Sequence, residues 1–96
     1  MRIAHICAAL LAASPAAALA QEAAQWAGTC AICHGTSGHS MGVTEALAGM
    51  PKDEMLRKMK EFRAGSRPSS IMGQLSKGYS DAQLEQIAAY FAAQKK

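Results

Sequence analysis

The 96-residue chain lacks several features that would point to common classes of protein. No cysteine follows Cys33, so a structural zinc site would lack the second pair of ligands that it needs. The formal net charge of +3 is too small to indicate a nucleic-acid partner. No stretch has the alternating pattern of a β-strand, and no segment repeats. These absences leave a small protein built from helices.

What the chain does contain is one dense motif, Cys30-Ala31-Ile32-Cys33-His34. Its C-x-x-C-H pattern is the attachment signature of a c-type haem. Residues three apart on a helix share a face, so both thiols can reach the vinyl groups of one porphyrin. His34, four residues after Cys30, lies on the same face, where its imidazole can bind the iron.

Other interpretations of this motif stay open at the level of sequence. A thioredoxin-like redox pair also uses C-x-x-C, but in a βαβ setting that this chain does not predict. The two cysteines could instead form a structural disulfide, or the match could be accidental. His39 is the histidine that could compete with His34 as a ligand. It is too near His34 in sequence to reach the opposite face of the iron easily, and we interpret it as an exposed loop residue.

Residues 1–20 have the features of a secretory signal peptide. Arg2 provides the positive end, and the run from Ile3 to Ala13 is almost wholly apolar. Ala18-Leu19-Ala20 is a small-x-small cleavage site, and the chain becomes polar directly after it. The apolar run is too short for a typical membrane span, although an uncleaved anchor is the alternative.

Cleavage after Ala20 would leave residues 21–96 as one mature domain. Cys7 comes too early for a lipid-anchored N-terminus and would leave with the signal peptide. Export agrees with the motif, because haem is attached outside the bacterial cytoplasm, in a compartment where thiols otherwise oxidise. We therefore expect a periplasmic protein without a stable membrane span.

Three segments have helical patterns. Glu22 to Ile32 is rich in good helix formers, and Trp26 lies on the face of Cys30, where we expect it to pack in the core. Pro51 to Ala64 is followed by Gly65, a typical C-terminal cap. Ser80 to Gln94 begins with the capping-box pattern S-x-x-Q. The expected buried stripes are Met55, Leu56, Met59, Phe62, Leu84, Ile87, Ala88 and Phe91.

The segment from Gly65 to Gly78 is predicted to be irregular, since it contains a proline and several glycines. Its apolar residues Ile71, Met72 and Leu75 should nevertheless be buried. A methionine in an apolar loop between two helices suits a ligand that approaches iron from the far side, so Met72 is the expected distal ligand. Met41 and Met50 are second choices, while Met55 and Met59 fit the core.

Together these parts resemble a small class I cytochrome c over residues 21–96. The resemblance rests on the helix that ends in C-x-x-C-H, the later methionine and the C-terminal stretch Ile87-Ala88-Ala89-Tyr90-Phe91. It implies an all-α fold of three to five helices around one covalently attached haem c. The expected cofactor-binding residues are Cys30, Cys33, His34 and Met72, with the last two also binding the metal.

A closer likeness is to the haem subunit of flavocytochrome c sulfide dehydrogenase and its relatives. It implies one-electron transfer from a flavoprotein that oxidises sulfide or another sulfur compound, with no enzymatic role for this chain by itself. A freely diffusing carrier to terminal oxidases and a haem-based gas sensor are the alternatives. The matching stretches are Cys33-His34-Gly35-Thr36, Glu61-Phe62-Arg63-Ala64-Gly65, Ser70-Ile71-Met72-Gly73 and Ser76-Lys77-Gly78-Tyr79-Ser80.

The chain departs from the pattern of this family at two places. Gly42-Val43 stands where Gly-Pro is frequent, and the resemblance implies that the carbonyl of Val43 holds the proximal histidine. Glu22 or Ala23 stands where the first helix often has a glycine at its crossing. Position alone suggests Arg67 and Tyr79 as partners of the haem propionates.

Overall fold

The computed structural model describes residues 15–42 and 44–96. Over these residues the chain forms only helices and irregular segments, with no strand, so the predicted all-α class is confirmed. None of the described helices combines the length and the apolar character needed to cross a membrane. In chain order, the helices are α1 (Pro15–His34), the short 3-10 helix η1 (Thr36–Gly38), α2 (Lys52–Ala64), α3 (Met72–Ser76) and α4 (Asp81–Ala92).

Helix α1 begins earlier than predicted. The expected helix started at Glu22, whereas the residues from Pro15 onward, where the described part of the chain begins, are already helical, and α1 runs through the whole C-x-x-C-H motif. The alanines before Glu22 are the strongest helix formers. The helix therefore includes the last residues of the predicted signal peptide. The rest of that prediction, residues 1–14, lies outside the described part of the chain.

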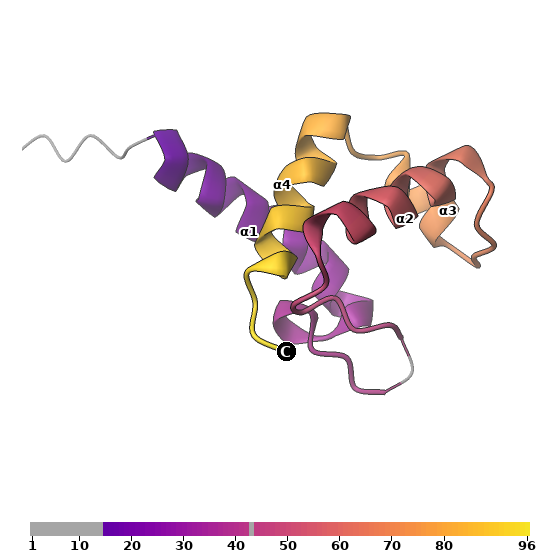
Figure 1. The fold of residues 1–96 in the computed structure, drawn as a ribbon, viewed down its shortest axis with the longest axis horizontal. Coiled ribbons are helices and arrows are strands. Elements are labelled where there is room, and N and C mark those ends of the chain that lie inside the picture. Colours follow the sequence, from indigo (N-terminus) through magenta and orange to yellow (C-terminus); the bar gives the residue numbers. More distant parts are fainter. Residues whose placement is uncertain (1–14, 43) are drawn as a thin grey trace, which may run out of the picture.

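Helix α4 packs across α1 (Figure 1). Ala23 and Ala27 are buried on α1, and Ala88 and Phe91 are completely buried on α4. The buried side chains that α1 contributes to this contact are alanines, where the resemblance implied a glycine. Trp26 packs against the same group of residues, as expected from the sequence.

The core lies where α1, α2 and α4 meet. Its buried cluster consists of Ala27, Met50, Met55, Ile87, Ala88 and Phe91. Leu56 and Met59 of α2 pack against this cluster without being fully buried, so this part of the predicted stripe faces the core. Phe62, the last residue of that stripe, is only partly buried, and the guanidinium of Arg67 lies over its ring. Met50 is a core residue, although it precedes the helix.

Both predicted caps are present. Gly65 adopts the left-handed conformation with φ of 79°, and its N–H donates to the carbonyls of Glu61 and Phe62. Ser80 and Gln83 form the complete capping box at the start of α4. Arg63 joins these two helix ends, since its guanidinium donates to the carboxylate of Asp81 and to the carbonyl of Tyr79.

The segment between α2 and α4 differs from the prediction. It is not wholly irregular, because Met72 begins the short helix α3. Ile71 and Leu75 were expected to be buried, but 54% and 41% of their surfaces are exposed. The reason is that α3 packs mainly against α2, which covers one side of this segment and leaves the other side open.

Candidate functional site

Cys30, Cys33 and His34 lie on the last turns of α1. The thiol of Cys30 is partly buried and that of Cys33 is exposed, and the two cysteines are not joined in a disulfide. Since they are three residues apart on a regular helix, both thiols share one face with His34. The helix therefore presents two thiols and an imidazole together, as the motif requires.

The environment of Cys30 does not favour thiol redox chemistry. Burial raises the pKa of this thiol, and its sulfur lies 3.9 Å from the carbonyl oxygen of Trp26. Redox-active pairs instead lower the pKa of one cysteine to produce a thiolate. The helical setting, without a βαβ unit in the described chain, also differs from the thioredoxin arrangement.

The ring of His34 is held by a backbone carbonyl. Its Nδ1 lies 2.6 Å from the carbonyl oxygen of Glu45. A carbonyl only accepts hydrogen bonds, so Nδ1 must carry the proton and donate it, which leaves the lone pair on Nε2. That nitrogen is the one available to a metal.

Among the described residues, Glu45 provides this carbonyl. The resemblance implied the carbonyl of Val43, which lies outside the described residues, and that expectation stays a prediction. The N–H groups of Leu47 and Ala48 both donate to the carbonyl of Gly38, which closes the loop after η1. This closure brings Glu45 over the end of α1.

The side chain of Glu45 is tied to helix α2. Its carboxylate lies 2.6 Å from the ammonium nitrogen of Lys58, and Glu54 provides a second carboxylate at 3.3 Å. The hydrogen bond that Lys58 donates to Glu45 is the largest cause of the raised pKa of Lys58, and Glu54 acts in the same direction while burial opposes it. This contact joins residues 13 positions apart and has no signal in the sequence.

Met72 lies on a different element from His34. It is partly buried at the start of α3, which packs against α2 rather than α1 (Figure 1). Two axial ligands bind a haem iron from opposite faces of the ring, so we expect them to come from separate elements. His34 on α1 and Met72 on α3 meet this condition. Met50 is buried in the core, while the side chain of Met41 is 94% exposed.

His39 is exposed and has both ring nitrogens engaged. Nδ1 lies 3.1 Å from the carbonyl oxygen of Thr36, and Nε2 contacts the carbonyl oxygen of Lys95. The prediction of an exposed loop histidine is thus correct. Its contact with the C-terminal segment had no signal in the sequence, because the two residues lie far apart along the chain.

The donor set suits a c-type haem. Two unpaired thiols, an imidazole with a fixed tautomer and a thioether are the groups that such a cofactor uses. Arg67 adds a buried Nε without a hydrogen-bond partner among the described residues, while its Nη2 binds the carboxylate of Glu61 at 3.1 Å. A propionate is an acceptor of the kind that this nitrogen lacks. Among those same residues no three His, Cys, Asp or Glu side chains gather as a metal site.

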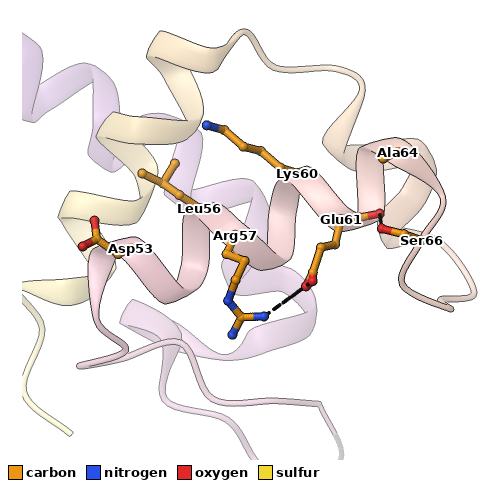
Figure 2. A pocket seen from close by; sticks show the side chains of 7 residues that line it. All are labelled: Asp53, Leu56, Arg57, Lys60, Glu61, Ala64 and Ser66. Carbon is orange, nitrogen blue, oxygen red and sulfur yellow. Dashed lines mark hydrogen bonds and ion pairs between the residues drawn. The ribbon is translucent and has the colours of Figure 1, made fainter.

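An open surface groove lies elsewhere, along helix α2 (Figure 2). It combines apolar and charged side chains, and Arg57 points across it to the carboxylate of Glu61 at 3.1 Å. None of the expected haem residues contributes to it, so it is separate from the candidate site. The residues that line it are Asp53, Leu56, Arg57, Lys60, Glu61, Ala64 and Ser66.

Comparison with protein families agrees with this geometry. The family model described as "Cytochrome c" matches residues 17–95, which is most of the chain. The match covers α1 from its first turns, the loop with Glu45, and all the helices that follow.

Individual relatives differ in how much of their length the chain spans. It is 38% identical over 63 residues to the cytochrome subunit of sulfide dehydrogenase from Chlorobaculum tepidum, covering 66% of this chain and 57% of that protein. It is 37% identical over 92 residues to cytochrome c-553 from Nitratidesulfovibrio vulgaris, covering 91% and 89%. It is 39% identical over 70 residues to a cytochrome c4 from Pseudomonas aeruginosa, covering 72% of this chain and 35% of that protein.

Proposed function

The chain belongs to the cytochrome c family, and on this basis we propose that Cys30 and Cys33 anchor its haem c while His34 and Met72 are the axial ligands. Proteins of this family are electron-transfer proteins that bind haem covalently, so the chain is a monohaem electron carrier rather than an enzyme. When bound, the haem supplies the one-electron redox chemistry.

The observation that carries the ligand assignment is the hydrogen bond between His34 Nδ1 and the carbonyl of Glu45. It orients the imidazole and reserves Nε2 for the iron. Met72 is a partly buried thioether on a separate helix, from which it could bind the iron independently of α1. A neutral imidazole and a thioether together favour ferrous iron, which gives a higher reduction potential than two histidines.

A first test replaces the candidate methionines one at a time. Met72→Ala should open the sixth coordination position, abolish the long-wavelength absorption of a methionine–iron bond and allow carbon monoxide to bind, with the haem still attached. Met41→Ala is the exposed control and should keep the wild-type spectrum. Met50→Ala tests the second choice within the core. A wild-type spectrum and potential in Met72→Ala would refute the assignment.

We further propose that residues 1–20 are removed on export and that the mature protein works in the periplasm. Bacterial class I cytochromes c are typically periplasmic. Export also supplies the two thiols to the compartment where haem attachment takes place. Mass spectrometry of the exported protein should show a chain that begins at Gln21 and carries one added haem mass. An N-terminus retained at Met1 would contradict the cleavage site.

As the electron donor we propose a flavoprotein that oxidises sulfide or another reduced sulfur compound. Two relatives support a partner that oxidises sulfur compounds, namely a cytochrome subunit of sulfide dehydrogenase and a thiosulfate dehydrogenase electron acceptor, while the flavin comes from the resemblance alone. The contact would be small and transient, as is usual for redox partners. A diffusing carrier is the second candidate, since the chain spans 89% of the small cytochrome c-553 but only 57% of the sulfide dehydrogenase subunit.

Recovery of the mature protein from its native periplasm separates these candidates. A co-purifying flavin-containing chain that reduces the haem when sulfide or thiosulfate is added supports the flavoprotein partner. Reduction of a terminal oxidase by the isolated protein, without a flavin chain, supports the diffusing carrier. Rapid binding of carbon monoxide to the wild-type protein would favour the sensor and reject both.

A further inference from the structure

We propose that Lys58 is a positioning residue for the axial histidine and acts through Glu45. The inference rests on the proposed function, because it takes His34 as a ligand of the iron. Glu45 makes two contacts at once: its backbone carbonyl lies 2.6 Å from His34 Nδ1, and its carboxylate lies 2.6 Å from Lys58 Nζ. Helix α2 is thereby connected to the imidazole through a single residue.

Lys58 is well placed to act as the fixed end of this connection. Only 16% of its side chain is exposed, and Glu54, one helical turn earlier, provides a second carboxylate at 3.3 Å. The same helix is anchored in the core by Met55. An ordered ammonium group between two carboxylates therefore faces the loop, which is a firmer arrangement than an isolated surface ion pair.

Among the described residues, few contacts anchor the segment that carries Glu45. Its side chain is 53% exposed. The nearest backbone bonds that hold the loop lie at Leu47 and Ala48, and Ser40 bonds the carbonyl of Thr44 on the other side. Besides the bond of its carbonyl to His34 on α1, the bond to Lys58 joins Glu45 to a second helix, α2, so it should affect how steadily the Glu45 carbonyl faces His34.

The strength of the Nδ1–H bond matters for the iron. An acceptor at Nδ1 fixes the ring and makes the imidazole a more basic ligand, which favours ferric iron. Weakening the acceptor should make the Nδ1 proton easier to exchange and raise the reduction potential. Lys58 would thus influence the redox centre without touching it.

The test compares two lysines on the same helix in the haem-containing protein. Lys58→Met removes the proposed contact. Lys52→Met is the matched control, because it removes one positive charge from α2 and an ion pair of 3.1 Å with Glu85 that does not involve the loop. Lys58→Arg should restore the contact. Glu45→Gln breaks the pair from the other side and keeps the backbone carbonyl, so the test does not depend on one variant folding.

In the ferrous protein, NMR should show the Nδ1 proton of His34 exchanging about fivefold faster in Lys58→Met and Glu45→Gln than in the wild type. A change of about fivefold is near the upper end of the stabilisation that one such ion pair provides. The potential should be higher than that of Lys52→Met, while Lys58→Arg should match the wild type. Equal exchange in Lys58→Met and Lys52→Met would overturn the proposal.

The same spectra distinguish this outcome from a failure of the proposed function. Ring protons of an axial histidine are strongly shifted by the porphyrin ring current. Unshifted His34 protons would mean that the ligand assignment is wrong. Shifted protons with unchanged exchange would mean that His34 is a ligand and that Lys58 does not position it.

Discussion

At the scale of single residues, His34 depends on a partner that its own helix cannot provide. The acceptor for Nδ1 comes from Glu45, on the loop that follows η1. That loop is closed by the carbonyl of Gly38, which accepts from Leu47 and Ala48. The geometry of the imidazole therefore depends on the turn at Gly38 as well as on the contact between Glu45 and Lys58.

Replacing Gly38 should test this dependence. Gly38 has φ of +80°, and an added Cβ would lie 2.8 Å from both Ala48 N and the Phe91 ring. Gly38→Ala should destabilise the protein by about 1–2 kcal/mol from the backbone conformation alone. Steric overlap of the new Cβ with Ala48 and Phe91 should add to this loss. Gly28→Ala is the control, since its Cβ would meet nothing within 4 Å in a helix and should stabilise by about 1 kcal/mol. Urea unfolding that leaves the two variants equal would contradict this account.

At the scale of elements, the ends of α2 and α4 are joined by one guanidinium. Arg63 donates to the carboxylate of Asp81 and to the carbonyl of Tyr79, beside the capping box of α4. The hydrogen bond from Arg63 is the main reason why the pKa of Asp81 is lowered. The contact therefore couples the folding of the two helices to pH.

The sign of this coupling follows from the direction of the shift. A carboxyl group with a lowered pKa in the folded state stabilises the protein above its unfolded pKa, and this stabilisation is lost as pH falls through the folded pKa. Asp81→Asn should therefore be less stable than the wild type at neutral pH, and the difference should vanish in acid below the usual aspartate range. Thermal unfolding of both proteins across that range provides the measurement. A difference that is constant with pH would rule out the linkage.

Local signals in the sequence were sufficient for most of the elements. The capping box at Ser80, the glycine after α2 and the motif on α1 each depend on neighbours within a few residues, and each was predicted correctly. The predictions for Ile71 and Leu75 were wrong because their exposure depends on which helix covers α3. Glu45 could not be identified as the partner of His34, since loop closure depends on distant hydrogen bonds.

At the scale of the whole molecule, the core is small for its length. The buried hydrophobic residues of the described chain are mostly alanines and methionines, with few large side chains among them: Ala23, Ala27, Ala48, Met50, Met55, Leu84, Ile87, Ala88 and Phe91. Chains of this size rarely fold stably on such a core without a covalent or metal-based staple. The covalent cofactor of the family provides one.

Removing both attachment points should therefore abolish the stable fold. The Cys30→Ala, Cys33→Ala double variant cannot form thioethers, so it loses the cross-link and the large apolar body of the haem together. We expect little exported protein and a broad, non-cooperative thermal transition by circular dichroism. A single substitution at the exposed Cys33 should be milder, because one thioether still holds the cofactor. A sharp, cooperative transition in the double variant would contradict this view.

The contacts of the C-terminal segment have a practical consequence for experiments on the protein. The carbonyl of Lys95 contacts His39, and the N–H of Gly49 donates to the carbonyl of Phe91, at 2.9 Å. The end of the chain thus lies against the two flanks of the loop that carries Glu45. A purification tag or reporter joined to Lys96 would start beside these contacts, so the reduction potential of tagged protein should be compared with that of untagged protein.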